Sequence, residues 1–343
     1  MTDDRNQLHD SLSRRLADAG SEPVWPALCG AGVVGLRVPA ELGGLGLPVL
    51  HAEPVFDVIG EHRASVPYVD VAIVAAGLLQ AERSDAGDAL LRSIAEGGDR
   101  VAVAGLDRRL RGTISATPTA QGWRLDGDAL LVMDDGDAGL LLVVARTEAY
   151  ATVLMLVRRD AEGVTGRTYP TIDGRHASDL RFINVAAELL CGDVEEALAV
   201  ATDEAIACTA VEAAALMRRL VADTLAFAKE REQFGQPIAR FQIVQHRLVD
   251  MHIHARRAGA IARRALGALD SHWRERSRLV SAAKVAIVEA GRFVGQNAVQ
   301  LHGGMGMTEE LSVGRYFKRL TVIENELGGA DDHLRRYAEL VAA

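Results

Sequence analysis

Residues 300–310, QLHGGMGMTEE, interrupt a region that otherwise has the pattern of a helix. Each of Gly303, Gly304 and Gly306 costs a helix about 1 kcal/mol relative to alanine. Glycine also permits positive φ angles and lets main-chain N–H groups approach a ligand closely. Because a helix that restarts after such a loop presents unpaired N–H donors, the pattern favours phosphate binding, with the Gln300 amide at its entry. An ordinary turn between two helices is the alternative.

A second stretch, residues 231–251, reads REQFGQPIARFQIVQHRLVDM. We expect one helix to run through Arg231 and to end at Gly235, and Pro237 to open the approach to the next helix. Arg231 then lies in the last turn of the first helix, and Gln242 lies near the start of the second. Taken alone, this is a helix end with a favourably placed arginine.

The elements around these stretches change in character along the chain. Residues 1–100 contain short helical patterns broken by a Gly/Pro-rich segment, and residues 101–192 contain short β-rich runs separated by Gly turns. Residues 193–343 carry apolar positions at helical spacing and a single proline, Pro237. These three regions predict an N-terminal helical domain, a middle β-barrel or sandwich, and a C-terminal antiparallel four-helix bundle. The fold class is therefore α+β.

Composition narrows the class of protein. Aromatic residues make up only 4% of the 343 residues, and alanine and arginine are abundant, which favours helix over strand. The net charge of −9 argues against nucleic acid as the main partner. Cys29, Cys191 and Cys208 have no metal-ligand spacing, so we expect free thiols and no metal site. No signal peptide or membrane-spanning run is evident, so a cytoplasmic location without membrane insertion is expected.

The two stretches together resemble one family. Arg-x-x-Phe-Gly followed by Gln242, and then Gln-x-x-Gly-Gly-x-Gly about 60 residues later, are similar to motifs of the acyl-CoA dehydrogenases. GLRVPAELGGLGLP, residues 35–48, is similar to the family's N-terminal Gly-x-x-x-Pro-x-x-x-Gly-Gly-x-Gly segment. The order of helices, β-domain and helix bundle is also the family's order. The resemblance implies FAD as cofactor and an acyl-CoA thioester as substrate.

The resemblance also implies roles for individual residues. In the family, both stretches bind the pyrophosphate and adenine side of FAD across a subunit interface. Carried over, Arg231 pairs with the pyrophosphate and Phe234 packs on the cofactor. Gln242, Gln300, Gly303 and Gly304 hydrogen-bond the cofactor or line its path.

The glutamate that family members use as catalytic base is not found at its usual place. Counting forward from the glycine stretch, that position falls on Leu327, which cannot accept a proton. An alternative position in some members falls on Ala205. Glu326 and Glu204 are the neighbouring weak candidates, and ion-paired or solvated carboxylates are the alternative reading. Two further candidates are weaker: Glu212 and Glu324.

The β-domain departs from the family pattern as well. Where the family shows Thr-Glu-Pro-x-x-Gly-Ser-Asp, this chain has GLDRRLRGTIS, residues 105–115. Where the family shows Asn-Gly-x-Lys-x-x-Ile-Thr-Asn, this chain has LDGDALLVMDD, residues 125–135. Val132, Met133 and Asp134 replace the aromatic or hydroxyl residues expected to touch the flavin ring.

The motifs for the pyrophosphate side of FAD are present, whereas the usual base and the residues expected to touch the flavin ring are not. In this respect the chain resembles the small, non-catalytic-type subunit of bacterial heterotetrameric acyl-CoA dehydrogenases that act on steroid-derived thioesters. Such a chain completes the FAD site of a longer paralogue that carries the base, in an α2β2 enzyme. Two alternatives stay open: a self-sufficient homotetrameric enzyme using Glu326 or Glu204, and a cofactor-free scaffold or regulatory homologue. The family implies an electron-transferring flavoprotein as acceptor, while nothing in the sequence indicates the acyl group.

Overall fold

The chain divides into two compact units. The helical unit comprises Met1–Ser13, Glu53–Ala64 and Ile206–Ala343, and the sheet unit comprises Arg14–Ala52 and Ser65–Ala205. The three-domain division made from the sequence remains a prediction. The computed structural model describes residues 2–19, 24–98, 100–107, 109, 114–134, 138–149, 151–307 and 311–342.

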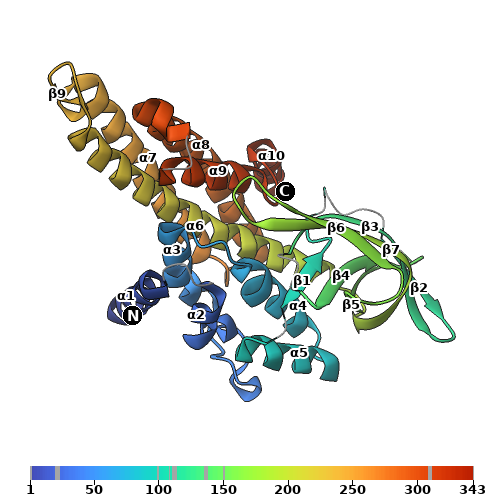
Figure 1. The fold of residues 1–343 in the computed structure, drawn as a ribbon. Helices are drawn as coiled ribbons and strands as arrows, with labels where there is room; N and C mark the ends of the chain where they lie inside the picture. The colour runs from blue at the N-terminus through green and yellow to red at the C-terminus, as the bar shows by residue number, and fades with distance from the viewer. Residues whose placement is uncertain are drawn as a thin grey trace. The chain divides into compact units, whose positions relative to one another are not determined.

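Long helices make up most of the helical unit (Figure 1). Its elements, some of which continue into the sheet unit, are α1 (Thr2–Ala19), α3 (Glu53–His62), α6 (Glu195–Glu230), α7 (Gln242–Leu266), α8 (Trp273–His302), α9 (Ser312–Asn325) and α10 (Ala330–Ala342). One face of α7 is buried, with Leu248 and Met251 followed by alanines at helical spacing. Small residues on this face let α7 and α8 approach closely.

The α7–α8 pair is antiparallel. The His254 ring stacks on Phe293 with ring centroids 4.3 Å apart, and Arg247 donates a 3.1 Å hydrogen bond to the Asn297 side chain. As the residue number rises along α7, the partner on α8 falls. The first residue of α7 therefore lies at the same end of the pair as the last turn of α8.

Among its described residues, the sheet unit contains a sheet of seven strands. They are β1 (Val101–Ala104), β2 (Ser115–Thr119), β3 (Gly122–Met133), β4 (Leu140–Arg146), β5 (Thr152–Arg158), β6 (Val164–Pro170) and β7 (His176–Cys191). The strands are bonded in the order β1-β4-β2-β3-β7-β5, and β5 also pairs with β4, which closes the path into a barrel. β6 adds to β7 outside this path. Leu125, Val143, Met155 and Phe182 are fully or almost fully buried in its core.

Helices precede the strands in the sheet unit. They are α2 (Val24–Gly30), the short 3₁₀ helices η1 (Val33–Gly35), η2 (Ala40–Leu42) and η3 (Val49–Ala52), the π-helix η4 (Val69–Ala75), α4 (Ala76–Ala81) and α5 (Asp85–Glu96). The ends of α5 follow from its sequence: the Ser84 hydroxyl accepts a 3.1 Å bond from the Gly87 N–H, and Gly97 ends the helix at φ 72°. The predicted α+β fold, helical at both ends and β-rich in the middle, is confirmed. No helix in the described ranges is long and apolar enough to cross a membrane.

Candidate cofactor-binding site

A tight β-hairpin follows α6, where the sequence predicted a continuing helix. α6 ends at Glu230, one residue before Arg231, and β8 (Glu232–Gln233) pairs with β9 (Gln236–Pro237). The two residues between the strands, Phe234 and Gly235, have φ angles of 53° and 76°. Two successive positive φ angles are the geometry of a two-residue hairpin loop, which a helix cannot adopt. The predicted helix through Arg231 to Gly235 was therefore wrong.

The hairpin presents its side chains to solvent. Phe234 is 93% exposed, an extreme value for a phenylalanine, and its ring meets the Phe241 ring edge-on with centroids 6.1 Å apart. Arg231 is exposed, and its carbonyl accepts a 2.8 Å bond from the Ile238 N–H. Within the described ranges the Arg231 guanidinium forms no ion pair. A fixed backbone thus holds an exposed aromatic ring beside an available cation.

The glycine stretch lies at the same end of the helical unit. The ring of His302, the last residue of α8, stacks on Phe227 near the end of α6, with centroids 4.2 Å apart. Gly303 follows at φ 59° and ψ −140°, a conformation that essentially only glycine adopts. The chain continues as the 3₁₀ helix η6 (Gly303–Met307), and residues 308–310 of the stretch lie outside the described residues.

Gly303 and Gly304 leave their backbone accessible. Both are exposed, and among the described residues no atom lies within 4 Å of the place that a Cβ would take at either position. Gly306 differs, because a Cβ there would lie 2.9 Å from the Val299 carbonyl oxygen. Two of the three glycines therefore offer main chain to a ligand, and the third serves packing.

Gln242 and Gln300 complete this group. Gln242 is the first residue of α7 and Gln300 lies in the last turn of α8; both side chains are exposed. Because α7 and α8 are antiparallel, both lie at the end where α6 gives way to the hairpin (Figure 1). The structure thus brings together all six residues selected from the sequence: Arg231, Phe234, Gln242, Gln300, Gly303 and Gly304. A cation, two amides and open glycine backbone are donors that fit a diphosphate.

Two candidate base residues, Glu212 of α6 and Glu326 directly after α9, form ion pairs with the same buried arginine. Arg319 binds both oxygens of Glu212, at 2.6 and 2.8 Å, and one oxygen of Glu326, at 2.8 Å. Burial disfavours the charge of Arg319, but the two carboxylates outweigh burial and hold its pKa well above the ordinary value. Leu327 follows at φ 52°, and the His333 ring bonds its carbonyl oxygen at 3.0 Å.

The remaining candidate carboxylates, Glu204 and Glu324, also form ion pairs. Glu204 is 7% exposed and forms a 2.6 Å ion pair with Arg37, whose guanidinium also donates to the Ile73 carbonyl. Ala205 is fully buried. Glu324 pairs with Arg292 on the surface of the helical unit. Each of these carboxylates would have to leave its arginine before it could act on a substrate.

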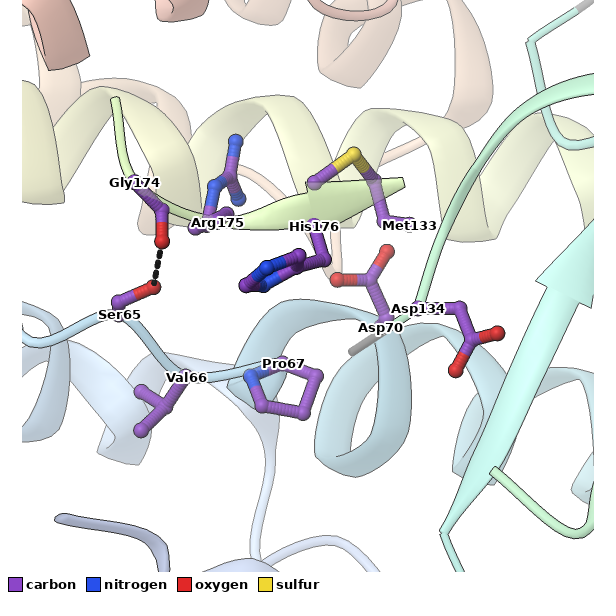
Figure 2. A pocket seen from close by; sticks show the side chains of 9 residues that line it. All are labelled: Ser65, Val66, Pro67, Asp70, Met133, Asp134, Gly174, Arg175 and His176. Atoms are coloured by element: carbon purple, nitrogen blue, oxygen red, sulfur yellow. Dashed lines mark hydrogen bonds between the residues drawn. The ribbon is translucent and has the colours of Figure 1, made fainter. Parts of the chain in front are cut away.

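The sheet unit contains a separate cavity of about 260 Å³ (Figure 2). It is lined by Ser65, Val66, Pro67, Asp70, Met133, Asp134, Gly174, Arg175 and His176. Figure 2 shows the side chains of Asp70 and His176 among those that line it. Sequence reasoning missed Asp70, Arg175 and His176, because they come from segments about 100 residues apart with no shared motif.

Asp134, one of the residues at the expected flavin-ring position, lines this cavity and is bound by neighbouring side chains and backbone. It is 4% exposed, forms an ion pair with Arg159, and accepts a 3.2 Å bond from the Ser178 hydroxyl. The Ala138 N–H donates to its other oxygen at 3.4 Å. A buried carboxylate with these partners, next to Met133, supplies neither the ring-stacking nor the hydroxyl contact expected for a flavin. Much of the other departing segment, residues 105–115, lies outside the described residues.

Comparison with known proteins agrees with these motifs. A family model for the acyl-CoA dehydrogenase C-terminal domain matches residues 200–339. The chain is 30% identical to acyl-CoA dehydrogenase FadE27 of Mycobacterium tuberculosis over 343 residues, covering 97% of this chain and 90% of the relative.

Two solved structures share the fold over nearly their whole length. A steroid ACAD variant, Tcur3481-Tcur3483, has a TM-score of 0.89 and 28% identity, covering 99% of this chain and 98% of that one. The ChsE4-ChsE5 complex from Mycobacterium tuberculosis has a TM-score of 0.89 and 26% identity, covering 98% and 97%. The fold, the motifs and the match to FadE27 together show that this protein belongs to the acyl-CoA dehydrogenase family.

Proposed function

We propose that this chain is the subunit of a heteromeric acyl-CoA dehydrogenase that completes the FAD site of a longer partner chain without supplying the catalytic base. One observation carries the proposal: Arg231, Phe234, Gln242, Gln300, Gly303 and Gly304, which we call the six phosphate-side residues, are exposed and lie at one end of the helical unit. The candidate base residues, in contrast, form ion pairs with arginines. A site whose donors all face outward is suited to a ligand held mainly by another chain.

The residues at this end would share the binding of FAD. Arg231 would neutralise part of the diphosphate charge, and the Gln242 and Gln300 amides and the Gly303–Gly304 backbone would donate hydrogen bonds. Phe234 would cover an apolar face of the cofactor. When bound, FAD supplies the hydride acceptor for α,β-dehydrogenation of an acyl-CoA thioester. The role of this chain is then to bind and orient the cofactor.

The ion pairs support a base supplied by the partner. A general base must be able to take a proton near neutral pH, and this usually requires a raised pKa. Glu204 and Glu326 each lie within 2.8 Å of an arginine nitrogen, so both carboxylates are already engaged in ion pairs. The self-sufficient alternative needs one of these ion pairs to open during turnover.

The comparisons support the class of partner and substrate. One similar structure is a complex of two differently named chains, and another bears the description steroid ACAD. We therefore propose a longer acyl-CoA dehydrogenase paralogue as partner and a steroid-derived acyl-CoA as substrate. An electron-transferring flavoprotein would reoxidise the flavin, and the complex would work in the cytoplasm.

Arg231→Ala tests the proposal in the complex purified after co-expression with the partner chain. We expect FAD affinity to fall about 10- to 100-fold, because a charge-assisted contact to the diphosphate is lost. Arg146→Ala, an exposed arginine on β4, is the matched control and should leave FAD content unchanged. Full retention of FAD by the Arg231 variant would contradict the proposal and favour a scaffold that kept only the fold.

A further inference from the structure

A concentration of arginines lies at the end of the α7–α8 pair that is remote from Gln242 and Gln300. Residues 256–278 contain seven arginines and only two acidic residues, Asp270 and Glu275, for a net charge of +5 in a chain of net −9. From Gln242, this end begins after roughly 20 Å of helix and extends to more than 30 Å. It is therefore separate from the proposed cofactor site.

Six exposed residues of this region define the surface that we name the basic end. They are Arg256, Arg257, Arg264, Trp273, Arg274 and Arg278. Arg263 is left out because its charge acts on the Glu53 carboxylate of α3. The α7 members share one face of the helix, since positions 256, 257 and 264 lie within about 100° of one another, opposite the buried alanines.

Most charges of the basic end lack an ion-pair partner among the residues that the structure describes. Arg256, Arg257, Arg274 and Arg278 form no ion pair with any carboxylate of the described residues. Arg264 reaches Glu275 only at 3.9 Å, and both side chains are largely exposed, so this pair contributes little. Clustered like charges repel one another, which is unfavourable for the isolated chain.

Trp273 adds an apolar anchor. It is 49% exposed, and the Arg274 guanidinium lies over its ring, 5.4 Å from the ring centroid. Tryptophan and arginine are the residue types most enriched among those that dominate binding energy at protein interfaces. Every cation here is arginine, whose planar fork binds carboxylates in a bidentate manner, and none is lysine.

We infer that the basic end is a docking surface for an acidic surface of another protein. Charge complementarity selects this partner: exposed guanidinium groups attract carboxylates, and Trp273 gives the contact an apolar centre. The overall charge of −9 argues against nucleic acid as the partner, because domains that bind nucleic acid are usually basic. Such a surface accelerates encounter and sets orientation, and its strength falls with salt.

The test uses the full chain and poly-L-glutamate as acidic probe, with binding measured by titration at several salt concentrations. The triple variant Arg256→Glu, Arg257→Glu, Arg274→Glu changes the charge by the same amount as a control triple variant, Arg92→Glu, Arg146→Glu, Arg167→Glu. The control arginines are exposed residues of the sheet unit. Thermal unfolding of both variants checks that the fold is intact.

We expect the wild-type chain to bind poly-L-glutamate with salt-sensitive affinity, the basic-end variant to bind at least about tenfold more weakly, and the control to change less than about twofold. Trp273→Ala should also weaken binding. Equal weakening in both triple variants, or no binding by the wild type at low salt, would overturn the inference. Tighter binding of duplex DNA than of poly-L-glutamate, or salt-sensitive self-association abolished by the basic-end variant, would also overturn it, because the occupant would then be of another kind.

Discussion

The rings of Phe227 and His302 stack with their centroids 4.2 Å apart, and this contact fastens the end of α6 to the end of α8. Arg231 lies four residues beyond Phe227, and Gly303 lies one residue beyond His302. Two motifs separated by about 70 residues in sequence are thus held at one end of the same unit. The contact is the structural basis for treating them as a single site.

His302 makes this contact sensitive to acid. Burial lowers the pKa of His302 below its ordinary value of about 6.5, so the folded chain favours the neutral ring. Its contribution to stability is therefore intact above about pH 6.5 and is lost as the pH falls. His302→Phe keeps a stacked ring without a titrating group, and we expect the thermal midpoint of this variant to fall less between pH 7.5 and 5.5.

His252→Phe, the same substitution at an exposed histidine on α7, is the matched control variant. The pH slope will not vanish entirely in the His302 variant, since burial also lowers the pKa of His62. If the thermal midpoints of wild type and His302→Phe fall equally with pH, titration of His302 does not contribute to the pH dependence of stability.

Phe234 occupies a backbone conformation that costs stability. A phenylalanine at φ 53° is uncommon, and an Asn-Gly pair is preferred in such a loop. Phe234→Asn should stabilise the free chain by about 1 kcal/mol in denaturant unfolding. The same variant should weaken FAD retention in the complex, because it removes the ring that we propose to cover the cofactor. Unchanged FAD retention would remove Phe234 from the proposed site.

The Arg319 cluster should matter for folding. Arg319→Met leaves the buried Glu212 carboxylate without its partner, and we expect a loss of about 3–5 kcal/mol in the free energy of unfolding. Glu326→Gln removes only one of the two carboxylates and should cost about 1 kcal/mol. Denaturant titration of both variants measures the difference, and equal losses would mean that the cluster does not act through Glu212.

Glu204 and Glu326 should be dispensable for turnover. Glu204→Gln and Glu326→Gln in the co-expressed complex are expected to keep acyl-CoA dehydrogenase activity within about threefold, since the proposed function assigns the base to the partner. Removing a true general base costs about 10²- to 10⁴-fold. Steady-state assays that show such a loss for either variant, with FAD still bound, would support the self-sufficient alternative.

Sequence periodicity was enough to predict the helical regions and the β-rich middle, because buried faces repeat along each element. It failed at residues 232–237, where two-residue strands carry no alternation and Phe234 is not a typical turn residue. The six phosphate-side residues were selected from motifs, and their role in binding stays a prediction. Their convergence was not predictable, because it depends on the Phe227–His302 contact and on the antiparallel packing of α7 and α8.

The cavity in the sheet unit is a second feature that could not be predicted from the sequence. Asp70, Asp134 and His176 come from three separate segments that only the closed path of strands and the preceding helix bring together. Likewise, the sequence identified Glu204, Glu212 and Glu326 as candidate bases, but their arginine partners lie up to 167 residues away. Whether a carboxylate is available or ion-paired is decided by such long-range contacts.

The flavin absorbance of the purified protein tests the central claim most directly. The chain is expressed alone and together with a longer acyl-CoA dehydrogenase paralogue, and FAD per complex is measured in each preparation. We expect a colourless chain on its own and a yellow complex that contains both chains and oxidises acyl-CoA. A yellow chain, expressed alone, that reduces an electron acceptor with acyl-CoA would contradict the claim.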